Sequence, residues 1–155
     1  MKAAVFSDTH GMTALMLEAI RRSHPDAIIH LGDCVRDTDE IVREFPGIPL
    51  YNVQGNCDIC ADAPMSDTVP LGSVKAFICH GHEFNVRYGL DRLVYAAMEA
   101  DCRIAMFGHT HEAIYETLGG VTVINPGTAG KGRAPTWALV TVFDNGAVDC
   151  RISEL

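Results

Sequence analysis

The sequence is poor in basic residues. Its 155 residues include 12 Lys and Arg against 20 Asp and Glu, so the formal net charge is −8 with histidine neutral. An acidic chain gains no affinity through its net charge for the phosphate backbone of nucleic acids or for an anionic membrane surface. We therefore expect neither nucleic acid nor a membrane among its partners.

The sequence also has no long apolar run. The first such run, residues 3–6, is shorter than the core of a signal peptide and is followed at once by Ser7 and Asp8. No other run approaches the about 20 residues that a transmembrane helix needs. We expect a cytoplasmic protein whose six cysteines are reduced, most of them as small buried side chains.

Repeats, low-complexity stretches and linkers are absent as well. At 48% hydrophobic and 21% charged residues, the composition differs from that of a disordered acidic tail. A chain of this length buries about two-thirds of its unfolded surface, so folding requires no disulfide or structural metal. We expect one domain over residues 1–155.

The first half of the chain alternates short apolar strands with helices. Strands are predicted at 2–6, 27–31 and 48–53, and helices at 13–22 and 38–44. This alternation is typical of a parallel sheet covered by helices.

The second half is predicted to be richer in hairpins. Asn145-Gly146 between two alternating runs is a strong hairpin signal. We therefore expect an α/β fold in which two sheets pack together with helices outside. The remaining predicted strands are 67–71, 74–79, 103–107, 113–117, 121–125, 136–143 and 147–152, with a helix at 90–100.

Two apolar stripes mark the buried faces of the longer helices. Thr13 is a candidate N-cap for the first helix, and His24-Pro25 is expected to end it. His24 and His30, the latter inside a predicted strand, are interpreted as structural. The two stripes are Leu15, Met16, Ala19 and Ile20, and Leu93, Val94, Ala97 and Met98.

Residue types that bind metals stand directly after most of the predicted core strands. Ligands of α/β sheets bind at the carboxyl ends of strands. A single Asp-x-His or Gly-Asp motif is common by chance. Several motifs of metal-binding residues, each placed directly after a strand, predict a metal site. The candidate ligands are Asp8, His10, Asp33, Asn56, His80, His109 and His111, with His82 beside them.

This ligand set predicts a dinuclear centre. One divalent ion takes about four to six ligands, so seven suit two ions that share a carboxylate. Mixed oxygen and imidazole ligation favours Mn, Fe, Co, Ni or Zn over Ca or Mg. Two such ions about 3.5–4 Å apart clamp phosphoryl oxygens and lower the pKa of a bridging water. We expect hydrolysis of a small phosphate ester by metal-bound hydroxide.

The order of the motifs resembles a known family. In sequence they are Asp8-x-His10, Gly32-Asp33, Gly55-Asn56-Cys57-Asp58, His80-Gly81-His82, Gly108-His109-Thr110-His111 and Asn125-Pro126-Gly127-Thr128. This set resembles the calcineurin-like metallophosphoesterase superfamily, and is most similar to its small, cap-less bacterial and archaeal phosphodiesterases of the YfcE or MJ0936 type. The resemblance covers nearly the whole chain and implies a four-layer α/β/β/α sandwich of two mixed sheets flanked by helices.

The resemblance also implies a role for each residue. Asp33 would bridge two ions, Asp58 would hold or orient groups at the site, and His82 would stand beside the ligands or face the substrate. The first ion would be held by Asp8, His10 and His111, and the second by Asn56, His80 and His109.

Cys57 departs from the pattern of many superfamily members, which have histidine directly after the metal-binding asparagine. A thiol with a pKa near about 8.5 is a poorer acid than imidazolium at neutral pH, and it adds no positive charge. We therefore expect a preference for diesters and for good leaving groups.

Other readings of the sequence remain open. The pair Cys57 and Cys60 also fits a thiol-redox site, although it overlaps the candidate ligand Asn56. A non-catalytic scaffold similar to the small subunit of retromer, and a nuclease, are the alternative functions. The late hairpin could pair between subunits in a homo-oligomer. Candidate phosphate contacts, each with a solvated surface role as its alternative, are Arg36, Arg87, Lys131 and Arg133.

Overall fold

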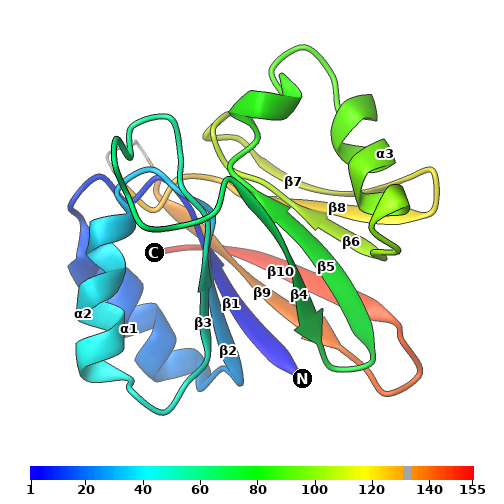
Figure 1. The fold of residues 1–155 in the computed structure, drawn as a ribbon. Helices are drawn as coiled ribbons and strands as arrows, with labels where there is room; N and C mark the ends of the chain where they lie inside the picture. Colours follow the sequence, from blue (N-terminus) through cyan, green and yellow to red (C-terminus); the bar gives the residue numbers. More distant parts are fainter. Residues whose placement is uncertain (131–133) are drawn as a thin grey trace.

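The computed structural model describes residues 1–130 and 134–155 and consists of two five-stranded sheets packed face to face (Figure 1). Helices α1 (Thr13–Ser23) and α2 (Thr38–Glu44) pack on one sheet, and α3 (Asp91–Glu99) packs on the other. The layers therefore follow the order α/β/β/α, which confirms the fold class predicted from the sequence.

The first sheet is built around β1 (Lys2–Phe6). Strands β2 (Ala27–His30) and β3 (Leu50–Asn52) extend it in parallel on one side, and β9 (Thr136–Val142) and β10 (Val148–Glu154) extend it in antiparallel fashion on the other. The parallel half comes from the βαβ segments of the first part of the chain, as the sequence predicts.

The second sheet has a parallel centre and antiparallel edges. Its order is β4 (Ser66–Leu71), β5 (Val74–Cys79), β6 (Ile104–Met106), β8 (Val121–Pro126) and β7 (Ala113–Leu118). Strands β5, β6 and β8 run in parallel, so their carboxyl ends reach the same edge of the sheet.

Apolar side chains fill each of the three spaces between the layers. Val5, Ile29 and Ile78 belong to the core between the two sheets. The core under α1 includes Met16 and Ile20. The third core, under α3, includes Leu93, Val94 and Ala97. Both helical stripes of the sequence are thus largely buried.

Two local predictions are wrong, and two short elements were missed. Met12, and not Thr13, occupies the N-cap of α1, and no side chain in residues 1–130 or 134–155 caps this end. Met98 is 51% exposed, because it lies at the edge of the stripe beside Gly119, which has no side chain to cover it. Two short 3-10 helices, η1 (Val35–Asp37) and η2 (His82–Phe84), were not predicted.

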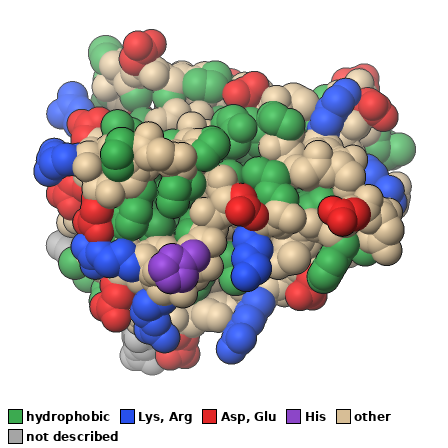
Figure 2. Space-filling model, turned by 90° about the horizontal axis from the view of Figure 1, so that it is seen from below, with side chains coloured by type: hydrophobic (Ala, Val, Ile, Leu, Met, Phe, Trp, Pro, Cys, Tyr) green, Lys and Arg blue, Asp and Glu red, His purple; other side chains and the backbone are tan. Residues whose placement is uncertain are grey.

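The two ends of the sandwich differ in character. The end that holds the N-terminus and the β4–β5 and β9–β10 turns shows hydrophobic side chains between charged ones and little histidine (Figure 2). The loops that carry the predicted ligands leave the strands at the opposite end (Figure 1). None of the helices in residues 1–130 and 134–155 is long and apolar enough to cross a bilayer.

Candidate metal centre

The loops that follow β1, β2, β5 and β6 meet at one end of the sandwich. Within the first sheet, the Asp8 N–H donates to the Gly32 carbonyl at 3.0 Å, and within the second, the Gly108 N–H donates to the His80 carbonyl at 3.0 Å. Between the sheets, the His109 N–H donates to the Asp8 carboxylate at 3.2 Å. These bonds bring residues from four strand ends into one site.

Asp8 is the buried centre of a first ligand group. One ligand atom from each of Asp8, His10 and His111 lies within 4.8 Å of the others. Asp8 Oδ2 accepts hydrogen bonds from the Ser7 hydroxyl at 2.5 Å and from the His109 N–H. Its other oxygen, Oδ1, lies 3.0 Å from His111 Nε2. The protein therefore holds one carboxylate oxygen and leaves the other facing the histidines.

His80 is the centre of a second group that also includes Asp8 and Asp33. Its Nδ1 lies 2.7 Å from the Leu31 carbonyl, and a carbonyl can accept a hydrogen bond only from a nitrogen that carries a proton. In a neutral ring, the proton is therefore on Nδ1 and the available lone pair is on Nε2. Nε2 lies 3.2 Å from Asn56 Oδ1 and 3.5 Å from Asp33 Oδ1. Three lone-pair atoms thus face one another, an arrangement that a cation stabilises. The carbonyl that orients the ring is also typical of metal-binding histidines.

His82 and His109 complete the imidazole cluster around His80. The ring centroid of His80 lies 5.1 Å from that of His109 and 5.5 Å from that of His82. Burial, aided by the neighbouring His80, lowers the pKa of both rings, which favours the neutral, metal-binding form. His82 Nδ1 is buried and has no hydrogen-bond partner among the described residues. The donor set therefore fits a metal better than it fits a closed hydrogen-bond network.

Asp33 is held as a carboxylate by the loop after β3. Burial alone would raise its pKa, but the hydrogen bond from the Cys57 N–H at 2.9 Å and the nearby His80 outweigh burial, and the pKa is lowered. The Asp33 carboxylate in turn raises the pKa of the exposed Cys57 thiol to about 11. A thiol that stays protonated is a weak nucleophile, which disfavours the redox reading of Cys57 and Cys60.

Asp58 ties the two ligand-bearing loops of the first sheet together. Its Oδ1 accepts the Val35 N–H and its Oδ2 accepts the Gly55 N–H, both at 2.8 Å. Both oxygens are thus engaged with backbone next to Asp33 and Asn56. This arrangement orients the loops, and it leaves Asp58 little capacity to contact a substrate.

The ligand loops adopt backbone conformations that side chains rarely tolerate. The φ angles of Asp8, His10, Asp33, His109 and His111 are 55°, 45°, 57°, 66° and 60°. Residues other than glycine seldom occupy this left-handed region, and such residues concentrate at functional sites.

Glycine is required where the loops approach most closely. A Cβ at Gly55 would collide with the Asp33 carboxylate, and one at Gly108 would collide with the Ser7 hydroxyl and lie 2.9 Å from Asp8 Oδ2.

The structure thus brings all seven candidate ligands together, with His82, Cys57 and Asp58 next to them. Of the candidate phosphate contacts, Arg87 reaches the site, because its Nη2 donates to the His109 carbonyl at 3.3 Å. Arg36 is exposed on η1. Lys131 and Arg133 lie outside the described residues. Sequence reasoning missed Ser7, whose only signal was its place beside Asp8.

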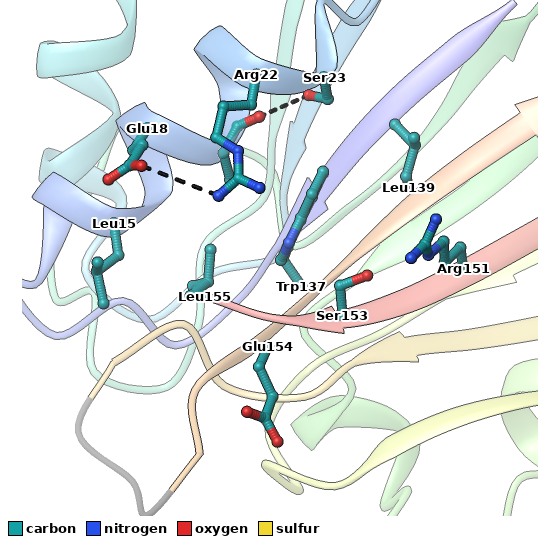
Figure 3. Close-up of a pocket in the computed structure, with 11 residues that line it drawn as sticks. Leu15, Glu18, Arg22, Ser23, Trp137, Leu139, Arg151, Ser153, Glu154 and Leu155 are labelled. Atoms are coloured by element: carbon teal, nitrogen blue, oxygen red, sulfur yellow. Dashed lines mark hydrogen bonds and ion pairs between the residues drawn. The ribbon is translucent and has the colours of Figure 1, made fainter.

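A separate cavity of about 310 Å³ lies between α1 and the outer face of β9 and β10 (Figure 3). Trp137 and Leu139 line it from the sheet, Arg22 from the helix, and Arg151 from the edge strand. The described residues around it include no histidine or cysteine. Its chemistry differs from that of the candidate metal centre, so we do not assign it to the same site.

Comparison with known proteins supports the resemblance seen in the sequence. Residues 1–145 match the model of the calcineurin-like phosphoesterase superfamily domain. The chain is 31% identical over 154 residues to a probable metallophosphoesterase, YsnB, of Bacillus subtilis, covering 95% of this chain and 88% of the relative. It is 30% identical over 146 residues to phosphodiesterase MJ0936 of Methanocaldococcus jannaschii, covering 82% and 83% of the two chains.

The fold is also similar to those of solved structures. The crystal structure of Vps29 complexed with zinc from Entamoeba histolytica superposes with a TM-score of 0.80 over 99% of both chains, at 21% identity. Its likeness concerns the fold, whereas the family model and the curated relatives concern the sequence. Together they show that this chain belongs to the calcineurin-like phosphoesterase superfamily.

Proposed function

We propose that the protein is a phosphodiesterase that hydrolyses a small phosphate ester with the aid of two divalent transition-metal ions, chosen from Mn, Fe, Co, Ni and Zn. The observation that carries the proposal is the convergence of two ligand groups on the buried carboxylate of Asp8. Two ions bound there would neutralise phosphate charge and lower the pKa of the attacking water.

The assignment of ligands to the two ions combines the family resemblance with the contacts in the structure. Asp8, His10 and His111 would hold the first ion, since their ligand atoms already lie within 4.8 Å of one another. The family resemblance gives Asp33 the bridging place and assigns Asn56, His80 and His109 to the second ion; of these, His80 Nε2 lies 3.5 Å from Asp33 Oδ1. Ser7 and the Leu31 carbonyl orient Asp8 and His80 in advance, which reduces the cost of ordering them.

The residues around the ligands would act on the phosphate and its leaving group. Arg87 places a guanidinium beside His109, where it could neutralise a phosphate oxygen. Cys57 is exposed, and a neutral thiol there would give little help to a poor leaving group. His82 supplies a further imidazole on the side of His80 and His109. This balance favours diesters, which carry less charge than monoesters.

The test is an assay of chelator-treated protein with added Mn²⁺, Ni²⁺, Co²⁺, Zn²⁺ or Mg²⁺. Bis(p-nitrophenyl) phosphate serves as the diester and p-nitrophenyl phosphate as the monoester. We expect metal-dependent hydrolysis that favours the diester. Asp33→Asn should lower this activity by more than the about 10- to 100-fold that is typical when a residue that only orients a metal ligand is replaced. Asp39→Asn, an exposed residue on α2, is the matched control. Absence of turnover with every metal would refute the proposal.

A non-catalytic scaffold is the second candidate, because the fold superposes well on Vps29. That Vps29 structure was itself solved with zinc, so a retained ligand set does not by itself separate a scaffold from an enzyme. The same assay separates the two, since a scaffold would give no turnover with any metal. The charge of −8 weighs against a nuclease. A cytoplasmic location and a homo-oligomer stay predictions from the sequence.

A further inference from the structure

Thr9 lies between the candidate ligands Asp8 and His10, yet its side chain points into the protein. It is fully buried, as is His30 at the end of β2. The Thr9 hydroxyl lies 3.2 Å from His30 Nε2 and 2.6 Å from Asp37 Oδ2. Asp37 Oδ2 also accepts the Gly11 N–H at 2.7 Å. These contacts form a continuous chain of hydrogen bonds beneath the metal centre.

The geometry fixes the direction of every bond in this chain. The Gly32 N–H donates to His30 Nδ1 at 3.3 Å, so Nδ1 carries no proton and the proton of the neutral ring is on Nε2. His30 Nε2–H then donates to the Thr9 hydroxyl. That hydroxyl has one proton of its own, which it donates to Asp37 Oδ2. Each N–H or O–H group in this series of hydrogen bonds therefore donates to one acceptor, and no donor is left unpaired.

Burial supports this assignment independently of the bond directions. It lowers the pKa of His30 to about 4, even though Asp37, Asp58 and Asp8 act in the opposite direction. The ring is accordingly neutral at physiological pH, as the bond from Gly32 requires. In a protonated ring, the Nδ1–H would point at the Gly32 N–H, and the hydrogen bond between them would be lost.

This series of hydrogen bonds connects the two loops that carry the ligands of the first sheet. Thr9 and Gly11 flank His10 in the loop after β1. His30, the last residue of β2, and Asp37, in η1, lie on either side of Asp33, and the Thr9 hydroxyl also lies 3.5 Å from the Asp33 carbonyl. A buried linkage of this kind holds two strained loops at a fixed separation, which a pair of shared metal ions requires.

We infer that Asp37, Thr9 and His30 are positioning residues, and that their hydrogen-bonded linkage sets the geometry in which Asp8, His10 and Asp33 bind metal. The inference rests on the proposed function, because it assigns these residues a role through the metal site. They do not touch the metal or the substrate. Their effect would appear first in metal affinity, and in activity only as a consequence.

The experiment compares Thr9→Val with Thr9→Ser in the full chain. Valine keeps the shape of threonine and removes the hydroxyl, whereas serine keeps the hydroxyl. Isothermal titration of the chelator-treated protein with Mn²⁺ should show affinity about 10- to 100-fold weaker in Thr9→Val and near the parental value in Thr9→Ser. Asp37→Ala, with Asp39→Ala as its control, should weaken Mn²⁺ binding in the same direction and serves if Thr9→Val does not fold.

A second readout does not depend on metal. The ¹⁵N chemical shifts of the His30 ring should report a neutral ring protonated on Nε2 in the parent at pH 7, and the Nε2 signal should move in Thr9→Val. Mn²⁺ affinity in folded Thr9→Val equal to the parental value would overturn the positioning role alone. A ring protonated on Nδ1 would overturn the linkage itself. A parent that binds none of Mn²⁺, Ni²⁺, Co²⁺ and Zn²⁺ would overturn the positioning role together with the proposed function.

Discussion

His30 should make the stability of the protein depend on pH in a measurable way. Burial lowers its pKa from 6.5 to about 4 in the folded state. Below pH 6.5 the unfolded chain therefore binds a proton at this residue that the folded chain does not, and the free energy of unfolding falls as the pH is lowered toward about 4. Lowering the pH from 7 to 5 should cost about 2 kcal/mol through His30 alone.

Urea unfolding of the parent and of His30→Gln at the two pH values, with a chelator present throughout, measures this contribution. Glutamine does not titrate, so the difference in unfolding free energy between pH 7 and pH 5 should be about 2 kcal/mol smaller in the variant. His24→Asn removes an exposed histidine at the left-handed end of α1 and should keep the parental difference. Equal pH dependence in the parent and in His30→Gln would refute the assignment of a neutral buried ring.

Three further substitutions test the site. Cys57→His adds an imidazole that can carry positive charge, and should raise the ratio of monoester to diester hydrolysis with the two nitrophenyl substrates; an unchanged ratio would contradict the role given to Cys57. Arg87→Gln should raise KM about tenfold by removing a charged contact to phosphate, whereas Arg92→Gln on α3 should leave KM unchanged, and equal values for both would count against Arg87. Asp58→Asn keeps one acceptor oxygen and should lower the free energy of unfolding by about 1–2 kcal/mol in urea titration; parental stability would show that its two backbone bonds contribute little.

The periodic parts of the fold could be predicted from the sequence because burial alone determines them. The strands at Lys2–Phe6 and Val74–Cys79 and the helix at Thr38–Glu44 have the predicted bounds. The predicted strand 48–53 is shorter in the structure, since Pro49 has no N–H to donate to the sheet and β3 begins only at Leu50. The prediction of Thr13 as the N-cap was wrong because the Met12 N–H donates a hydrogen bond to the Thr9 carbonyl. The loop that carries the ligands therefore determines where the helix begins.

The candidate ligands could be found because their place at strand ends is itself a local property of the sequence. The groups that hold them could not. His30 and Asp37 contact Thr9 from 21 and 28 positions away, and nothing in their immediate sequence marks them. The two backbone bonds of Asp58 likewise become visible only when the loops after β2 and β3 are placed side by side. Local periodicity therefore predicts which residues reach the site, and tertiary hydrogen bonds determine how they are held.

The proposed mechanism requires two ions that act together at this site. The most direct measurement follows the hydrolysis of bis(p-nitrophenyl) phosphate while Mn²⁺ is added stepwise to chelator-treated protein, at a protein concentration well above the dissociation constant. If two ions act together, there should be no hydrolysis without metal, and the activity should rise to a plateau at two equivalents of Mn²⁺ per chain. A plateau at one equivalent, or no hydrolysis at any amount of metal, would contradict it.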